Sequence, residues 1–201
     1  MRRLNLVFAA TVTAALLVLT SASGLPIAAA QGGSVSLFDG QSLEGWQRAA
    51  GPAEWTVEDG AITAVAAGGS SFLRSTREFA NFELTLEFWA EEPGTNSGVY
   101  IRCPAQGGIS QRSCYEINIS DAHPTYPTGS IVDLQASPPG ATTGRWNTLA
   151  ILADETHLVV RLNQQVVADV RDDRHPSGAI ALQAFGTGRV RFRNIQIRSL
   201  P

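Results

Sequence analysis

The chain has 201 residues, and its 15 basic and 18 acidic side chains give a formal net charge of −3. This balance excludes the basic surface that binding to nucleic acid requires. The length is suited to one domain with a sizeable core and leaves little room for a second.

The first thirty residues differ in composition from the rest. Arg2 and Arg3 precede an apolar run at 6–19, and the stretch ends in three alanines at 28–30. This order is typical of a Sec-type signal peptide, and the run falls short of the roughly 20 apolar residues of a membrane span. We expect cleavage after Ala30, and no cysteine is present there to be lipidated. Residues 31–201, with a net charge near −5, are therefore expected to form one domain, secreted or otherwise extracytoplasmic, without a membrane anchor.

Beyond residue 30, short β-rich runs alternate with Gly, Pro, Asn or Asp turns, and almost nothing recurs at helical spacing. The clearest run is 82–88, where apolar and polar side chains alternate as in a strand with one buried face. Other expected strands lie at 54–58, 61–65, 72–75, 98–102, 115–119, 146–152 and 178–184. So many short strands favour two packed layers.

Near the C-terminus, the alternating run 158–162 and the run 166–170 predict a hairpin with its turn at 163–165. In the last strand, Val190 and Phe192 are out of phase with Ile195 and Ile197, and a bulge near Asn194 reconciles the two. Segments 66–71 and 137–144 are rich in turn residues and are expected to be surface loops at the rims of the sandwich.

Cys103 and Cys114 are the only cysteines. In an exported chain the natural interpretation is a disulfide that closes the loop 104–113. Two free thiols are the alternative, while a metal pair is disfavoured because two cysteines without neighbouring histidines do not complete a zinc shell.

Seven short motifs occur in an order that resembles the 3-keto-disaccharide hydrolase family. They are Leu37-Phe38-Asp39-Gly40 with Leu43, Gly45 and Trp46; Trp55-Thr56-Val57-Glu58-Asp59-Gly60; Phe82-Glu83-Leu84; Asn96-Ser97-Gly98-Val99-Tyr100-Ile101-Arg102; Tyr115-Glu116-Ile117; Gly144-Arg145-Trp146-Asn147; and Phe192-Arg193-Asn194-Ile195. The resemblance spans nearly all of the expected mature chain.

The resemblance implies an all-β, concanavalin-like jelly roll of two curved antiparallel sheets, whose concave sheet binds an oligosaccharide or glycoside. It also implies action on glycosides already oxidised to a ketone at C3, by elimination or net hydrolysis. A C3 ketone acidifies the hydrogen on C2, so a carboxylate base can remove it and the enolate can expel the group at C1. Such a site needs a base, a cation or donor near the enolate oxygen, and an acid for the leaving group.

Three residues are candidates for the chemistry. Glu116 matches the family's Tyr-Glu pair and is the expected general base, although a solvated carboxylate on an outer strand face has the same pattern. Arg102 is the expected electrostatic helper, or alternatively half of an ion pair between neighbouring strands. Asp121 is a second carboxylate, an acceptor for a sugar hydroxyl, part of a metal shell if one exists, or a turn former before His123-Pro124.

Four further residues are candidates for sugar contacts: Asn96, Tyr115, Asn118 and Trp146. Asn118 stands where the family usually has the longer glutamine, and Asn96 also fits a plain turn. Trp146 could be a platform for a sugar ring or part of the core, and the core is the expected place for Trp46 and Trp55.

No cofactor is expected, and a divalent metal stays open because such an ion could polarise the ketone. His123, His157 and His175 show no metal-ligand spacing and are interpreted as surface residues. No nucleophile elbow of the G-x-S-x-G type is present, which argues against a serine hydrolase.

One position departs from the family pattern, because Phe185 stands where a histidine usually precedes the glycine of the penultimate turn. Loss of that histidine keeps a second function open, a non-catalytic carbohydrate-binding or lectin-like module. A purely structural or adhesive sandwich is the third alternative.

Overall fold

The computed structural model describes residues 33–201, so the expected signal peptide lies outside the described residues. Within that range the chain is all-β, with thirteen strands and no helix. None of the described segments is a helix long and apolar enough to cross a membrane. The strands are β1 (Val35–Ser36), β2 (Trp46–Ala50), β3 (Glu54–Glu58), β4 (Ala61–Val65), β5 (Gly68–Phe79), β6 (Phe82–Ala90), β7 (Asn96–Cys103), β8 (Tyr115–Ile119), β9 (Asn147–Asp154), β10 (His157–Leu162), β11 (Gln165–Arg171), β12 (Gly178–Gly186) and β13 (Arg189–Ser199).

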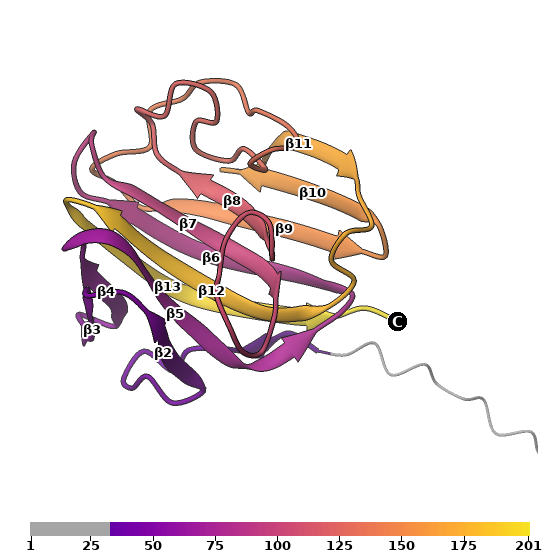
Figure 1. Ribbon diagram of the computed structural model, residues 1–201, viewed down its shortest axis with the longest axis horizontal. Coiled ribbons are helices and arrows are strands. Elements are labelled where there is room, and N and C mark those ends of the chain that lie inside the picture. The colour runs from indigo at the N-terminus through magenta and orange to yellow at the C-terminus, as the bar shows by residue number, and fades with distance from the viewer. Residues whose placement is uncertain (1–32) are drawn as a thin grey trace, which may run out of the picture. The chain divides into compact units, whose positions relative to one another are not determined.

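The strands form two antiparallel sheets that pack face to face (Figure 1). The larger sheet has eight strands in the order β11-β10-β9-β6-β13-β4-β3, with β1 paired to β13. The smaller has five, in the order β2-β5-β12-β7-β8. The expected all-β sandwich of two antiparallel sheets is therefore confirmed.

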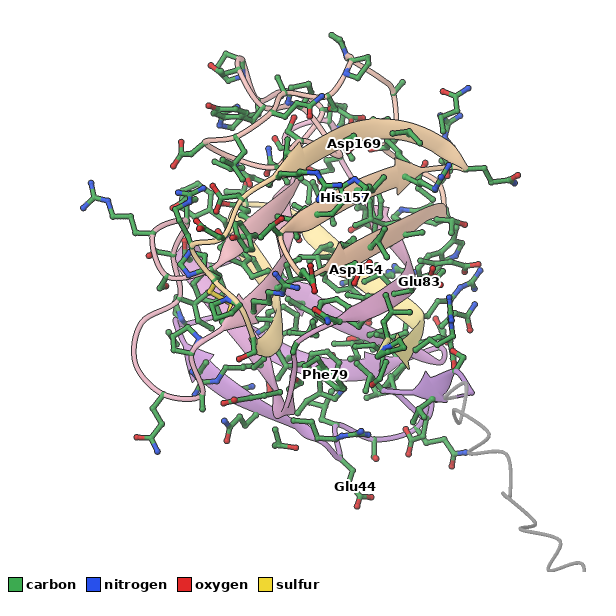
Figure 2. The ribbon with its side chains drawn as sticks, turned by 90° about the vertical axis from the view of Figure 1, so that its right-hand side faces the viewer. Glu44, Phe79, Glu83, Asp154, His157 and Asp169 are labelled. Carbon is green, nitrogen blue, oxygen red and sulfur yellow. A yellow bond between two sulfur atoms is a disulfide. The ribbon has the colours of Figure 1, made fainter. Side chains whose placement is uncertain are left out.

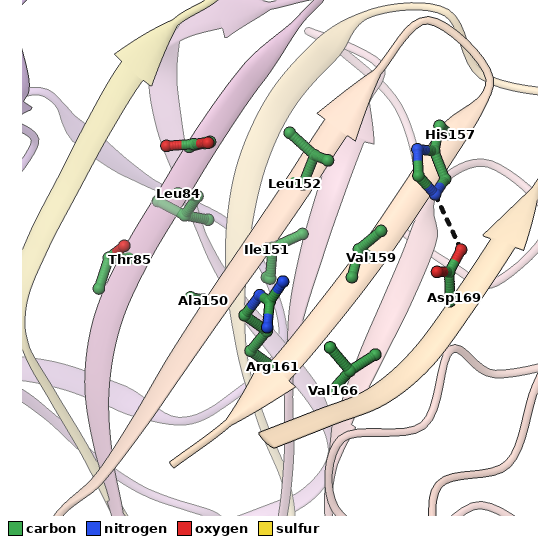
Figure 3. A pocket seen from close by; sticks show the side chains of 11 residues that line it. Leu84, Thr85, Ala150, Ile151, Leu152, His157, Val159, Arg161, Val166 and Asp169 are labelled. Carbon is green, nitrogen blue, oxygen red and sulfur yellow. Dashed lines mark hydrogen bonds and ion pairs between the residues drawn. The ribbon is translucent and has the colours of Figure 1, made fainter. Parts of the chain in front are cut away.

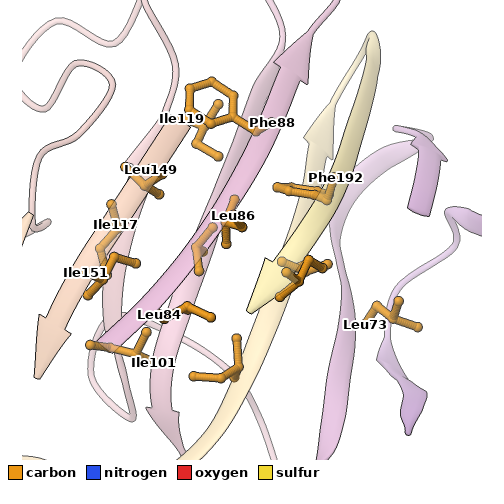
Figure 4. Packing of buried hydrophobic residues seen from close by; sticks show 14 of the residues in the cluster. Leu73, Leu84, Leu86, Phe88, Ile101, Ile117, Ile119, Leu149, Ile151 and Phe192 are labelled. Carbon is orange, nitrogen blue, oxygen red and sulfur yellow. The ribbon is translucent and has the colours of Figure 1, made fainter. Parts of the chain in front are cut away.

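A continuous hydrophobic core fills the space between the sheets. Leu84, Leu86 and Phe88 of β6 point inward from the larger sheet and are fully buried, and Ile117 and Ile119 of β8 face them from the smaller (Figure 4). The alternating residues of β6, such as Glu83, lie on the outer face of the larger sheet, as do His157 and Asp169 (Figure 2). Trp46 and Trp55 belong to the core, as expected.

The C-terminal features follow the sequence pattern. Strands β10 and β11 form the expected hairpin, and Asn163 and Gln164 between them both have positive φ, as a two-residue type I′ turn requires. In β13 the pairing with β6 shifts register between Arg193 and Gln196, and Asn194 has φ 52°. The predicted bulge near Asn194 is thus confirmed.

One loop prediction was wrong. Residues 68–71 do not form a surface loop but begin β5, where Gly68 and Ser71 pair with Gly186 and Ala184 of β12. Glycine and serine have low strand propensity, so the long-range pairing with β12 decides the conformation here. The strands β1 and β2 were not predicted at all.

Candidate functional site

Strand β8 carries the central residue of the site. Tyr115, Ile117 and Ile119 belong to the main core. Because side chains alternate along a strand, Glu116 and Asn118 project from the opposite face, which is the outer face of the five-stranded sheet.

A pocket of about 180 Å³ opens on this outer face. Strands β5, β7, β8 and β12 form its floor, and the loops after β7 and β8 form its walls. Its lining residues are Ser70, Asn96, Gln111, Glu116, Asn118, His123, Val132, Gln183 and Phe185. The pocket therefore combines one carboxylate, one imidazole, four amides, a hydroxyl and one exposed aromatic ring.

Glu116 is only 4% exposed, and its Oε2 atom has no hydrogen-bond partner within residues 33–201. Burial raises the pKa of the carboxyl, the negative charge of Asp133 adds to this, and donors on Tyr100 and Gln111 lower it by less. A Cβ at Gly98 would lie 3.2 Å from Glu116 Oε1, so glycine leaves room for the carboxylate above the sheet. A buried carboxylate with an unpaired oxygen has both the basicity and the free lone pair that proton abstraction needs.

Gln183 of β12 lines the same pocket as Glu116, with β7 between their two strands. Its Nε2 donates to the Tyr100 hydroxyl at 3.1 Å and to Ser70 Oγ at 3.5 Å, while its buried Oε1 has no partner among the described residues. An unpaired buried acceptor costs free energy unless a ligand or water donates to it. Glu116 Oε2 and Gln183 Oε1 are therefore two buried acceptors without a partner among the described residues, on two side chains that line the pocket.

His123 enters the pocket from the loop after β8. Its Nδ1 accepts backbone N–H bonds from Thr125 at 3.3 Å and Tyr126 at 2.9 Å. With Nδ1 occupied as an acceptor, the neutral ring carries its proton on Nε2. His123 thus lines the pocket with a fixed tautomer and a donor N–H, which is more than the surface role expected from the sequence.

The segment between β7 and β8 forms one wall. The predicted disulfide between Cys103 and Cys114 is confirmed and closes this loop at its base. Within the loop, Ile109 packs in a small cluster with Phe72 and Tyr100 on the outer sheet face. Gln111, which follows, reaches the pocket and donates toward Glu116.

The structure does not bring Arg102 to Glu116. The guanidinium donates to the backbone carbonyls of Ala80 at 2.8 and 2.9 Å, Glu155 at 2.7 Å and His175 at 3.1 Å. Arg102 has φ 55°, and the β7–β12 register shifts next to it. This bulge turns the side chain away from the outer face, so Arg102 is neither the expected electrostatic helper nor half of an ion pair between strands.

Two aromatic candidates also lie outside the pocket. Tyr115 points into the core, where its hydroxyl donates to Asp172 Oδ1 at 2.7 Å, and burial raises its pKa to about 12. Trp146 precedes β9, and the Arg193 guanidinium lies 3.9 Å from its ring centroid while Trp89 contacts its edge. Since Trp89 and Arg193 are on the outer face of the eight-stranded sheet, Trp146 cannot contact a ligand beside Glu116.

Asp121 holds loops together. Burial opposes its ionisation, but hydrogen bonds from Thr142, Thr128 and Thr143 outweigh this and keep its pKa below the ordinary value. Five contacts of 2.6 to 3.0 Å occupy its two oxygens. Asp121 is thus engaged by protein donors and does not line the pocket.

Of the predicted site residues, the structure gathers Glu116, Asn96 and Asn118 in one pocket. Asn118 donates through Nδ2 to the Tyr126 carbonyl, which ties the strand to the His123 loop. Sequence reasoning missed Gln183, although its alternation with Leu182 and Ala184 on β12 was a usable signal. His123 and Gln111 lie on loops, and no periodic pattern could have placed them.

A larger hollow, of about 390 Å³, lies on the outer face of the eight-stranded sheet (Figure 3). Its lining combines apolar side chains such as Leu152 and Val159 with the charged groups of Glu83 and Arg161 and with the pair between His157 Nε2 and Asp169 Oδ1 at 2.8 Å. Both of its carboxylates have cationic or imidazole partners, Asp169 in His157 and Glu83 in Arg198, so this hollow offers less for chemistry than the Glu116 pocket. Within residues 33–201, no three His, Cys, Asp or Glu side chains converge as metal ligands.

The fold and the pocket together define a β-sandwich protein with a polar pocket on one sheet face. A family profile described as the 3-keto-alpha-glucoside-1,2-lyase-like domain matches residues 33–198. The chain belongs to this family, as the sequence motifs predicted.

Similar proteins carry related names. A 3-keto-disaccharide hydrolase of Bacteroides thetaiotaomicron is 35% identical over 78 residues, which cover 34% of this chain and 27% of the relative. The match thus spans about a quarter of that protein's length.

Solved structures share the fold. A "putative glycosyl hydrolase" from Parabacteroides distasonis is 26% identical with a TM-score of 0.67, covering 84% of this chain and 100% of the other. A second structure with that name from the same organism has 19% identity and a TM-score of 0.70, over 84% and 94% of the chains. The carbohydrate-binding module CBM66 of Bacillus subtilis has 16% identity and a TM-score of 0.62, over 77% and 96%.

Proposed function

We propose that this protein acts on 3-keto-glycosides, removing the proton on C2 and releasing the group at C1 by elimination or net hydrolysis. Membership of the 3-keto-alpha-glucoside-1,2-lyase-like family supports the substrate class, as does the name of the Bacteroides relative. The observation that carries the proposal is the buried Glu116 carboxylate, which lines the pocket with an unpartnered oxygen.

Glu116 is the general base of this mechanism. It takes the C2 proton, the C–H electron pair forms an enolate with the C3 ketone, and the enolate collapses to expel the C1 oxygen and leave a C1=C2 double bond. Water then adds across that bond when the overall result is hydrolysis. The raised pKa of Glu116 makes it a stronger base than an exposed carboxylate, which suits abstraction of a carbon-bound proton.

His123 and Gln183 are the proposed partners of Glu116. The Nε2–H of His123 is the donor for the departing C1 oxygen, since no arginine or lysine lines the pocket among residues 33–201. Gln183 Oε1 accepts from a ring hydroxyl and so orients the sugar, because it has no protein donor of its own among the described residues. Asn96 and Asn118 add amide groups around the same ring.

Turnover of a 3-keto-glucoside tests the proposal. The assay follows loss of the alkaline ketosugar chromophore with wild type and with the variants Glu116→Gln and Glu83→Gln. Removing a general base lowers kcat by about 10²- to 10⁴-fold, so we expect that loss in Glu116→Gln alone. Glu83 is the matched control because its exposed carboxylate pairs with Arg198 on the opposite face. Equal turnover in Glu116→Gln and wild type would exclude Glu116 as the base.

A carbohydrate-binding module without turnover is the second candidate. The absence of a cationic side chain from the pocket lining of residues 33–201 favours it, since an enolate is then stabilised only by neutral donors. This candidate predicts that wild type and Glu116→Gln bind the 3-keto-glucoside alike and that neither consumes it.

We also propose that the mature chain is exported. The signal-like pattern of residues 1–30 supports this, and so does the disulfide, because such bonds persist mainly in oxidising compartments.

A further inference from the structure

Phe185 is an exposed aromatic ring at the mouth of the Glu116 pocket. It is 41% exposed, and the other large hydrophobic side chains exposed within residues 33–201 are all valines. A single exposed apolar residue needs no explanation on an ordinary surface. Here, however, the ring lines a pocket whose other lining residues are mostly polar.

The strand geometry fixes where this ring stands relative to the chemistry. Gln183 and Phe185 project from the same face of β12, and two residues along a strand correspond to about 7 Å. Gln183 is deep in the pocket and only 5% exposed, so Phe185 stands one step outward from the floor. Asn96 of β7 is its direct cross-strand partner and sets an amide beside the ring.

The size of the pocket limits how much of a substrate it can enclose. Its volume of about 180 Å³ is below the range of about 300–1,000 Å³ that is typical of sites enclosing a whole drug-sized ligand. The reacting ring must reach Glu116 on the floor, so the rest of a larger glycoside extends past the rim. Phe185, exposed at the mouth, and its cross-strand neighbour Asn96 are two of the lining residues available to that part of the ligand.

We propose that Phe185 is a stacking platform for a ring in the aglycone, so that the protein favours glycosides whose leaving group is itself a sugar or an aromatic ring. A phenyl ring offers no hydrogen bond, and it therefore selects the apolar face of a flat partner. The amide of Asn96 forms hydrogen bonds with the polar edge of the same partner. The inference rests on the proposed function, which places the reacting ring at Glu116.

The test measures equilibrium binding in the Glu116→Gln background, where the proposed chemistry does not consume the ligand. The ligands are methyl 3-keto-α-glucoside, a 3-keto α-linked disaccharide and phenyl 3-keto-α-glucoside, titrated by calorimetry. Phe185 is changed to Ala, Leu or Trp, where Leu keeps apolar bulk without a flat ring. Val166→Ala is the matched control, because Val166 is exposed to a similar degree, 48%, but lies on the opposite sheet.

We expect Phe185→Ala and Phe185→Leu to weaken binding of the disaccharide or of the phenyl glycoside by about tenfold, which is the effect of losing one aromatic contact. Phe185→Trp retains affinity, and all variants bind the methyl glycoside alike. Loss confined to the disaccharide identifies a sugar ring as the natural partner, and loss confined to the phenyl glycoside identifies an aromatic one.

Full affinity in Phe185→Leu, an equal loss for the methyl glycoside, or no binding of any ligand would overturn the proposal. Thermal melting of each variant shows whether a loss comes from misfolding, and Phe185→Trp and Phe185→Leu keep the test decisive if Phe185→Ala is unstable. Turnover by the unmutated protein is measured separately. Failure of the proposed catalysis is therefore distinguishable from failure of the stacking role.

Discussion

Glu116 illustrates how a functional residue can oppose folding. The fold places its carboxylate under the disulfide-closed loop, where it is 4% exposed and one oxygen lacks a partner. Burial penalises the charged form and raises the pKa, and Asp133 adds a like charge. The wild-type protein thus keeps a destabilising carboxylate at the place where the proposed mechanism needs a base.

The Glu116→Gln variant is expected to be more stable than wild type at neutral pH, by about 1 kcal/mol. A carboxyl whose pKa is raised in the folded state costs nothing below its unfolded value of about 4.3. Its cost begins as the pH rises above that unfolded value and is complete once the pH exceeds the folded pKa. The gain in melting temperature, about 2–4 °C per kcal/mol for a chain of this size, is therefore small at pH 4 and larger at pH 8.

Thermal melts between pH 4 and pH 8 measure this difference, with Glu83→Gln as the exposed control. A gain that is independent of pH, or greatest at pH 4, would show that Glu116 is not held with a raised pKa.

The sequence could indicate Glu116 but not its surroundings. Alternation in the run 115–119, with the Tyr-Glu motif, placed the residue on a strand face. The position of Arg102 could not be foreseen, because a bulge and a positive φ turn its side chain away. His123 could not be foreseen either, since two backbone N–H groups in its own loop orient the ring.

At the scale of elements, the loop 104–113 connects the disulfide to the site. Cys103 ends β7 and Cys114 immediately precedes β8. Ile109 anchors the loop on the outer sheet face, and Gln111 then reaches the pocket. The bond therefore restrains the wall of the pocket as well as the two strands.

Replacing both cysteines by alanine is expected to lower the free energy of unfolding by about 2–4 kcal/mol, as for other loops of about this length. A freed loop also loosens Gln111, so KM for a 3-keto-glycoside should rise by a larger factor than kcat falls. Urea denaturation and steady-state kinetics measure the two effects. An unchanged denaturation midpoint would contradict the first, and an unchanged KM would show that the loop holds its place without the bond.

Periodicity predicted most strands because their inner faces are apolar at every second position, as in β6. It failed for the start of β5, where the run Gly68-Gly69-Ser70-Ser71 has turn composition but pairs with β12. Ser70 is also a pocket residue. Because 66–71 was predicted to be a loop, Ser70 was not recognised as a site residue. A local sequence pattern does not reveal which distant segments will pair as strands.

At the scale of the whole molecule, the number and alternation of strands were enough to predict two packed sheets, and the ordered motifs predicted the family. Neither could reveal how the sheets are tied at their ends. Arg102 makes one such tie: its side chain extends from β7 of the smaller sheet to Ala80, in the turn that joins β5 of the smaller sheet to β6 of the larger, and to Glu155, in the turn between β9 and β10 of the larger sheet.

Arg102 is 1% exposed, and its five hydrogen bonds satisfy three backbone carbonyls and the Asn81 side chain. Burial lowers its pKa, yet a guanidinium stays charged in proteins, so each of these bonds is charge-assisted. Arg102→Met keeps the length of the side chain but leaves the carbonyls of Ala80, Glu155 and His175 without their donor.

We expect Arg102→Met to lose about 3 kcal/mol or more of stability, a decrease of about 6–12 °C in melting temperature. The melting temperature of Arg102→Lys should lie between those of wild type and Arg102→Met, because a single ammonium cannot span three carbonyls. Turnover per folded molecule, measured well below the melting transition, should match wild type because the guanidinium points away from the Glu116 pocket. A variant that melts normally but has lost turnover would instead support a catalytic role for Arg102. In that case the bulge in β7 would have to open when substrate binds.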